Sequence, residues 1–257
     1  MPLQDLQRPV VFAHRGASAF APENTLASFR LAAELGAPAI ELDVKLTADS
    51  QVVVLHDHTL DRTTDGHGLL AQKTLAQVKQ LDAGSFFAPQ FQGEPIPTLA
   101  EVFEAVGRRV FINVELTNYT TPTDDLVSRV VEVIRAAKME TRIIFSSFNP
   151  LNLIRAGRVL PEVPLGLLAT EGRSGALARS FVGHLIPHQA LHPYLEDVNR
   201  KLVDAVHAQG RRVHVWTVNP EAEMRRLFAY GVDGIFTDDP SLALKVFAEM
   251  REKSGQG

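Results

Sequence analysis

AIELDVKLTADSQVVVL, residues 39–55, contains two short apolar runs rich in valine and isoleucine, and each run predicts a β-strand. Only seven residues, KLTADSQ, join the two runs. A crossover between parallel strands needs about ten residues or more, so the second run is predicted to fold back on the first as a hairpin. This assignment decides the fold, because it removes one strand from the count over the whole chain.

The rest of the chain alternates predicted strands with amphipathic helices, which is the pattern of a parallel sheet. The apolar runs that predict strands are residues 10–13, 39–44, 52–55, 110–116, 142–147, 164–169, 184–188, 212–218 and 234–237. Setting 52–55 aside leaves eight of the nine, and a chain of 257 residues has the usual length of a TIM (β/α)8 barrel. An open doubly wound sheet is the alternative. It is weaker because the loop after the first strand, HRGASAFAP, has a single glycine instead of a glycine-rich phosphate loop.

The predicted helices include residues 25–35, with Asn24 as a possible N-cap, and the segments 124–138, 195–210 and 222–231. Residues 57–98 interrupt the alternation with many polar residues, turn signals and one short predicted helix. A barrel would place a single helix there. We therefore predict one domain over residues 1–257, with a small insertion at about 57–98 that follows the second strand unit.

Composition excludes several classes of protein. The net charge is −4 and neither sign dominates, so no broad nucleic-acid or membrane-surface partner is expected. The chain has no cysteine, which excludes disulfides, zinc–thiolate sites and thiol nucleophiles. No apolar stretch approaches the ~20 residues of a membrane span, and MPLQDLQRPV does not resemble a signal peptide. We expect a soluble cytoplasmic protein; its oligomeric state cannot be predicted.

Carboxylates recur at the predicted strand ends where a barrel places its chemistry. Glu41 and Asp43 alternate along one strand and share a face, and Glu115 lies in the strand 110–116. The intervening Ile40, Leu42 and Val44 are predicted to face the helices, which turns the carboxylates into the barrel. Three converging carboxylates repel one another unless a cation lies among them, and an all-oxygen ligand set favours Mg²⁺ or Ca²⁺.

Two histidines also occupy strand ends. His14 and Arg15 follow the first strand, and His56 follows the excursion strand. A single histidine in such a place is more often structural, but two beside a divalent cation suit displacement at phosphorus, with one as base and the other as acid. Arg15 would then offset phosphoryl charge. Trp216 could belong to the core, and Asp238-Asp239-Pro240 is predicted to be a turn and helix cap, not a ligand pair.

Together the motifs resemble those of the bacterial cytoplasmic glycerophosphodiester phosphodiesterases. The motifs are HRG (14–16), PENT (22–25), ELDV (41–44), TADSQVVVLHD (47–57), DRTTDG (61–66) and GVDGIFTDDP (231–240). The resemblance, which runs from about residue 9 to 245, implies a TIM barrel with a small insertion. It also implies metal-dependent hydrolysis of a small-molecule glycerophosphodiester to sn-glycerol 3-phosphate and an alcohol. The residues that match the family pattern are His14 and His56 as acid/base pair, Glu41, Asp43 and Glu115 as metal ligands, Arg15 as phosphate contact and Trp216 as an apolar wall near the glycerol.

One position departs from the family pattern. The family's third strand usually reads Glu-x-Lys, and that lysine helps to hold the phosphate, whereas this chain reads Glu115-Leu116-Thr117. Lys45 is the next residue on the face of Glu41 and Asp43. It is predicted to be an exposed lysine at the barrel rim, with replacement of the missing lysine in substrate binding as the alternative.

Other functions remain open at this point. A metal-assisted lyase or isomerase explains the carboxylates but leaves the two histidines and Arg15 with less to do. A degenerate barrel that only binds phosphoesters is favoured by Thr117 alone. Lysophospholipase D-like activity on single-chain lipids is also possible, since Phe86 and Phe87 could contact an acyl chain, although we expect them to pack in the core of the insertion.

Overall fold

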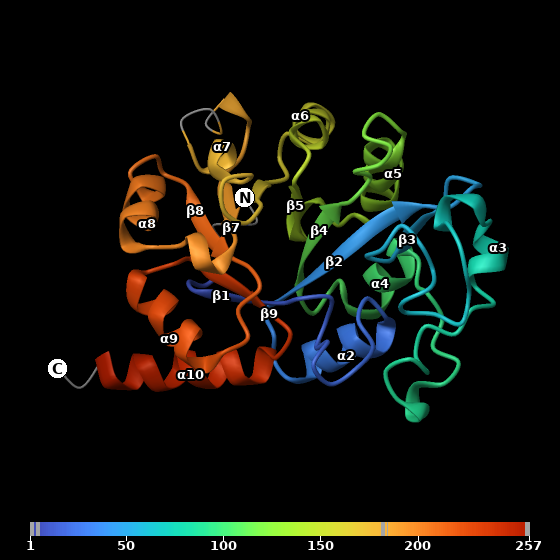
Figure 1. The fold of residues 1–257 in the computed structure, drawn as a ribbon, viewed down its shortest axis with the longest axis horizontal. Coiled ribbons are helices and arrows are strands. Elements are labelled where there is room, and N and C mark those ends of the chain that lie inside the picture. Colours follow the sequence, from blue (N-terminus) through green and yellow to red (C-terminus); the bar gives the residue numbers. More distant parts are fainter. Residues whose placement is uncertain (1–2, 4–5, 181–182, 184, 255–257) are drawn as a thin grey trace.

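Eight parallel strands close into a barrel, with helices outside them, in the computed structural model, which describes residues 3, 6–180, 183 and 185–254 (Figure 1). The barrel strands are β1 (Val10–Ala13), β2 (Ala39–Leu46), β4 (Phe111–Leu116), β5 (Ile143–Ser147), β6 (Leu165–Ala169), β7 (Ala190–Pro193), β8 (Arg212–Val215) and β9 (Gly234–Thr237). They pair in the order β1-β9-β8-β7-β6-β5-β4-β2, and β2 pairs with β1 to complete the ring. The predicted TIM barrel is confirmed.

The excursion strand β3 (Val52–Val54) pairs antiparallel with the end of β2, with Val44 opposite Val54 and Leu46 opposite Val52. The prediction that residues 52–55 form a hairpin with the second strand is therefore confirmed. β2 continues past its last pairing with β4, at Val44 and Leu116, so its end extends beyond the barrel rim.

The helices in the described part of the chain are α2 (Leu26–Glu34), α3 (Leu75–Val78), α4 (Leu99–Val106), α5 (Leu126–Ala137), α6 (Pro150–Val159), α7 (Ala176–Arg179), α8 (Arg200–His207), α9 (Glu221–Tyr230) and α10 (Pro240–Ser254). The main core lies between strands and helices. Ile40, Leu42 and Val44 are fully buried there among apolar side chains of the helix layer, such as Leu99 and Val102 of α4, as predicted. None of the helices in the described ranges combines the length and apolar character needed to cross a membrane.

Two predictions about local structure are wrong. Residues 184–188 were expected to form a strand; the strand is β7, a few residues later, and His184 lies outside the described residues. β7 has the sequence ALHP, and its histidine and terminal proline are not typical of a buried strand. All four residues are nevertheless buried. Thr25, not Asn24, caps α2: Thr25 Oγ1 accepts from the Ser28 N–H, and Ser28 Oγ accepts from the Thr25 N–H.

Residues between β3 and α4 contribute no strand to the barrel and have their own apolar cluster, which includes Leu55, Leu60, Leu70 and Val78. The segment contains α3 and the short 3-10 helices η1 (Leu70–Gln72) and η2 (Pro89–Phe91) and lies at one side of the barrel (Figure 1). Phe86 and Phe87 are 42% and 37% exposed, so the prediction that they form the core of this segment is wrong.

The barrel interior contains a layer of aromatic rings. Phe12 stacks on Phe236 with ring centroids 4.6 Å apart, and His214 lies against both Phe12 and His192. His192 Nε2 and His214 Nδ1 are 3.2 Å apart, so one ring donates to the other. Gly166 makes room for this layer, because a Cβ there would lie 2.3 Å from Cε1 of His192. Burial lowers the pKa of His192 to about 3 and that of His214 well below its usual value.

These two histidines predict acid sensitivity. In the unfolded chain an imidazole has a pKa near 6.5. Between that pH and about 3 the unfolded state therefore binds a proton at His192 that the folded state does not bind. The free energy of unfolding falls as the pH falls through this range. For His192 this lowers the free energy of unfolding by about 2 kcal/mol between pH 7 and pH 5. His192→Leu should therefore lose less stability over this range than the wild type, as measured by urea unfolding. His67→Gln, at an 83% exposed side chain, is the control and should behave as wild type. Equal losses in all three proteins would contradict the argument.

Candidate active site

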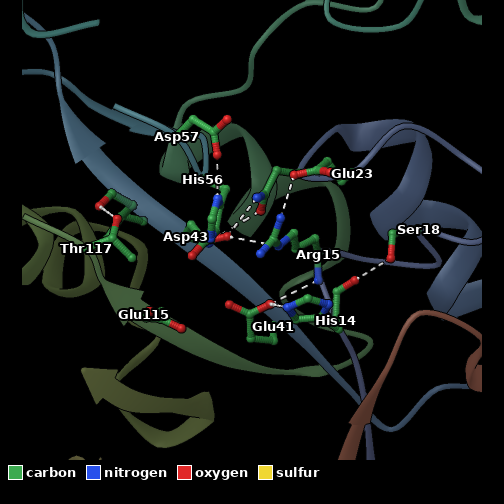
Figure 2. Close-up of polar contacts among 12 residues, drawn as sticks. His14, Arg15, Ser18, Glu23, Glu41, Asp43, His56, Asp57, Glu115 and Thr117 are labelled. Atoms are coloured by element: carbon green, nitrogen blue, oxygen red, sulfur yellow. Dashed lines mark hydrogen bonds and ion pairs between the residues drawn. The ribbon is translucent and has the colours of Figure 1, made fainter. Parts of the chain in front are cut away.

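Three carboxylates converge inside the barrel mouth (Figure 2). Asp43 of β2 stands opposite Glu115 of β4 in the strand register, and Glu41 lies one pleat below Asp43 on the same face. One ligand oxygen from each residue lies within 4.8 Å of the others. Glu41 and Asp43 are only 3% and 2% exposed, so water cannot screen them fully. Tyr119 donates its hydroxyl to Glu115 Oε1 at 2.7 Å and fixes that side chain.

The protein itself offsets only part of this charge. Burial, together with repulsion among the carboxylates, raises the pKa of Glu41 well above its usual value and that of Glu115 to about 8. Burial acts on Asp43 in the same direction, but the nearby charges of Arg15, His56 and His14 and the hydrogen bond from Asn24 together outweigh it, and the pKa of Asp43 is lowered. The donor set is all oxygen, buried and short of positive charge, which fits a hard divalent cation such as Mg²⁺ or Ca²⁺.

His14 lies beside this cluster with one ring nitrogen engaged. Its Nδ1 is 2.7 Å from Asp238 Oδ1, while Nε2 is 4.0 Å from Glu41 Oε2. Asp238 also accepts hydrogen bonds from Ser18 Oγ and Asn219 Nδ2. Burial raises its pKa, but these hydrogen bonds prevail and lower it to about 2. The anionic Asp238 therefore favours a proton on Nδ1 and leaves Nε2 without one.

The segment Asp238-Asp239-Pro240 was predicted to be a turn and helix cap, and this prediction did not include the contact that Asp238 makes with His14. Asp239 caps α10, with its Oδ1 accepting from the Leu242 N–H at 2.9 Å. Asp238 is not a cap: it orients His14, a residue 224 positions away in the chain. No local pattern in the sequence could have indicated that contact.

His56 stands at the other side of the carboxylates, close to Asp43 (Figure 2). Its Nδ1 lies 2.6 Å from Oδ1 of the next residue, Asp57. The side chain is 42% exposed, so His56 faces the mouth of the site more than His14 does. Both histidines thus share one arrangement, in which a carboxylate engages Nδ1 and leaves Nε2 available.

The HRG turn places Arg15 and its neighbours. The main-chain N–H of Arg15 donates to Glu41 Oε2 at 3.0 Å, Nη1 donates to Glu23 at 2.8 Å, and Nε lies 3.5 Å from Asp43 Oδ2. Gly16 has φ +86°, and a Cβ there would meet Ser28 Oγ at 2.3 Å, so the turn requires glycine. The strand therefore ends at Ala13, and the turn after it brings His14 and Arg15 to the carboxylates.

Asn24 contributes to the site in a way that its predicted capping role did not include. It has φ +58°, and its side-chain amide donates to Asp43 Oδ2 at 2.9 Å while its Oδ1 accepts from the Asp43 N–H. The PENT segment therefore positions a carboxylate and does not merely start a helix. A buried amide that meets an anion in this way is a strong hydrogen-bond donor.

Lys45 is buried, not exposed at the rim. It is 6% exposed, and its Nζ donates to the main-chain oxygen of Thr117 at 2.9 Å and to Thr117 Oγ1 at 2.8 Å. The prediction of an exposed lysine at the rim is wrong because β2 continues through Leu46 and keeps Lys45 on the inward face. Burial lowers the pKa of Lys45, although Asp43 and Glu115 act in the opposite direction. The lysine thus lies beside the position where the family pattern has its own lysine.

A single cavity brings most of the predicted residues together. Its lining includes His14, Arg15, Glu41, Asp43, His56, Glu115 and Trp216, and adds Asn113, Ser146, Phe148, Leu168, Thr217 and Phe236, which the sequence did not indicate. Lys45 is not part of this lining. Trp216 donates its Nε1–H to the His192 main-chain oxygen at 2.8 Å and meets Phe148 edge to face at 5.4 Å. The indole therefore forms a fixed apolar wall.

Comparison with known proteins agrees with this geometry. Residues 14–242 match the model of the glycerophosphoryl diester phosphodiesterase family, which spans most of the chain and every residue of the carboxylate cluster. The chain belongs to this family. A glycerophosphodiester phosphodiesterase of Caldanaerobacter subterraneus subsp. tengcongensis is 39% identical over 240 residues, 93% of this chain and 98% of the relative. One of Bacillus altitudinis is 35% identical over 245 residues, 94% of this chain and 99% of the relative.

Solved structures give the same answer. An Oleispira antarctica phosphodiesterase in complex with the product sn-glycerol-3-phosphate superposes with a TM-score of 0.86 and 34% identity, covering 94% of this chain and 97% of that one. A glycerophosphodiester phosphodiesterase from Agrobacterium tumefaciens gives 0.79 and 30% identity, with 91% and 98% covered. The predicted resemblance to the glycerophosphodiester phosphodiesterases is confirmed.

The contact between His14 and Asp238 gives a direct test. Asp238→Asn removes the charge that stabilises a protonated His14, and in one of its two orientations the amide donates to Nδ1 and forces the proton to Nε2. We expect kcat on a glycerophosphodiester to fall about 10²-fold or more. Asp239→Asn is the matched control, because asparagine caps helices as well as aspartate does, and it should retain activity. Equal activities of the two variants would exclude this role for Asp238.

Proposed function

We propose that this protein hydrolyses glycerophosphodiesters to sn-glycerol 3-phosphate and an alcohol, with one divalent cation held by Glu41, Asp43 and Glu115. The observation that carries the proposal is the meeting of these carboxylates with His14 and His56 in one cavity of a chain from this family. The sn-glycerol 3-phosphate bound to the Oleispira antarctica phosphodiesterase supports the choice of product.

The cation is proposed from the donor set. Burial and the repulsion among the carboxylates raise the pKa values of Glu41 and Glu115, and a bound Mg²⁺ or Ca²⁺ would relieve that repulsion. When bound, the ion would supply positive charge to the phosphoryl oxygens and to the attacking oxygen. Tyr119 and Asn24 would keep Glu115 and Asp43 in place as ligands.

His14 and His56 are proposed as the acid/base pair. Each has a carboxylate at Nδ1, so each can accept or donate a proton at Nε2, and they flank the carboxylates from different elements (Figure 2). One would take a proton from the attacking water, and the other would protonate the departing alcohol oxygen. We assign the acid role to His56, which is nearer to solvent and to the side where an alcohol can leave.

Arg15 is proposed to contact the phosphate and Trp216 to form the wall beside the glycerol. Arg15 is already held at its Nη1 and main-chain nitrogen, so the guanidinium is fixed before substrate arrives. We further propose that residues 1–257 form one domain with the insertion at 57–98 beside the mouth. A cytoplasmic location stays a prediction.

Lys45 is proposed to replace the lysine that the family pattern has at position 117. Two of its three N–H groups go to Thr117, which leaves one for a phosphoryl oxygen. Thr117 Oγ1 in turn donates to the Val44 main-chain oxygen, so the threonine is a fixed holder for the ammonium group. The positive charge would then be supplied from β2 instead of β4.

Removal of the metal tests the function as a whole. Release of sn-glycerol 3-phosphate from a panel of glycerophosphodiesters should stop in EDTA and return with Mg²⁺ or Ca²⁺. Glu115→Gln should lower activity strongly, whereas Glu132→Gln, at a 63% exposed side chain on α5, should not. Full activity in metal-free buffer would contradict the proposed cation. Turnover of lysolipids in place of glycerophosphodiesters would redirect the substrate assignment, and binding without turnover would indicate a phosphoester-binding barrel.

The position of the lysine can be tested by moving it. A charge-assisted hydrogen bond is worth about 1.5–3 kcal/mol, so Lys45→Met should lower kcat/KM about tenfold to a hundredfold. Thr117→Lys alone should also lower it, since two ammonium groups would share one place. The double variant Lys45→Met/Thr117→Lys should recover activity relative to Lys45→Met. Lys201→Met, at an exposed position of α8, is the control. A change of less than threefold in Lys45→Met would exclude the proposed role.

A further inference from the structure

Arg62, in the DRTTDG motif, connects two loops of the site that are far apart in the sequence. Its Nε and Nη2 donate to the two carboxylate oxygens of Asp57 at 2.7 and 3.1 Å. Its Nη1 and Nη2 donate to the two oxygens of Glu23 at 2.7 and 2.8 Å. One planar guanidinium therefore binds two carboxylates, each through a pair of hydrogen bonds. The two carboxylates are 34 residues apart in the sequence (57 − 23).

Each of these carboxylates has a second partner in the active site (Figure 2). Asp57 Oδ1 meets His56 Nδ1 at 2.6 Å, and Glu23 Oε1 accepts from Arg15 Nη1 at 2.8 Å. Arg62 therefore contacts the proposed acid, His56, through Asp57. It contacts the proposed phosphate-binding residue, Arg15, through Glu23. It does not line the cavity itself.

The charges favour this arrangement at neutral pH. The hydrogen bonds from Arg62 are the largest cause that holds the pKa of Asp57 far below its usual value. Burial raises the pKa of Glu23, but hydrogen bonds from Arg62 and Arg15 outweigh it and the pKa is lowered overall. Both carboxylates are therefore anionic acceptors, and an anionic Asp57 fixes a proton on His56 Nδ1 and leaves Nε2 for the substrate.

We propose that Arg62 is a positioning residue that orients His56 through Asp57 and Arg15 through Glu23, and so couples proton transfer to phosphate binding. The inference rests on the proposed function of the site. The Arg62 side chain is 45% exposed, so these ion pairs add little to folding stability. Their effect is geometric, because a fixed planar fork sets the relative orientation of two carboxylates, which a lysine ammonium cannot do.

The two routes can be separated by variants. Asp57→Asn interrupts only the route to His56 and should lower kcat with little change in KM. Glu23→Gln interrupts only the route to Arg15 and should raise KM and weaken binding of sn-glycerol 3-phosphate. Arg62→Met should do both, each by about tenfold, the size of one charge-assisted hydrogen bond.

Non-additivity distinguishes positioning from a general loss of structure. Because Arg62 acts on His56 through Asp57, Arg62→Met should reduce kcat little further in an Asp57→Asn background. Arg129→Met is the matched control: its side chain is also 45% exposed and pairs with one carboxylate, that of Glu132, away from the site. It should leave kcat and KM unchanged, and thermal unfolding should be the same for Arg62→Met and Arg129→Met.

A spectroscopic measurement tests the inference without turnover. In ¹⁵N-histidine-labelled protein at about pH 9, where free imidazole is neutral, His56 should carry its proton on Nδ1, with its signal assigned from His56→Gln. In Arg62→Met that signal should shift towards the Nε2–H form, and in Arg129→Met it should not. If the wild type hydrolyses no glycerophosphodiester, the proposed function is wrong. The positioning role of Arg62 is then tested by the tautomer comparison alone. Wild-type kcat, KM and tautomer in Arg62→Met would overturn the inference.

Discussion

Repulsion among Glu41, Asp43 and Glu115 is the constraint on which the rest of the site depends. The barrel turns their side chains inward because Ile40, Leu42 and Val44 must face the helices, so the apolar core and the charged site are two faces of one strand. In a buried setting this charge has few ways to be relieved. The chain supplies Arg15, the Arg15 N–H and the Asn24 amide, and the remaining deficit is what makes the pocket suited to a cation.

Strands and loops contribute different residues to the site. The strands fix the carboxylates through backbone pairing, which varies little once the barrel has closed. The loops supply both histidines proposed to move a proton and also Arg15, and each of these is held by a second side chain: His14 by Asp238, His56 by Asp57 and Arg15 by Glu23. Lys45, the other proposed phosphate contact, comes from β2. Loop residues gain the precision of strand residues only through such partners.

Much of this could be predicted from the sequence, and the failures have physical causes. Alternating or continuous apolar runs revealed seven of the eight barrel strands, because each buries its residues with little ambiguity. The run at 184–188 misled because β7 is built from ALHP, whose histidine is buried in an aromatic layer and not at a surface. The metal-ligand candidates followed from a period of two. Asp238 and the burial of Lys45 did not, because both depend on where the chain returns in space and on how far β2 continues.

β2 is longer than any other barrel strand, and its end is shared between two structures. Up to Val44 it is barrel wall paired with β4, and from Val44 to Leu46 it pairs with β3, from which residues 57–98 extend. The base of that segment is therefore rigidly joined to the backbone that carries Glu41 and Asp43, while its far end is free of the barrel sheet. Insertions, deletions and surface changes at the far end can accumulate without displacing the carboxylates.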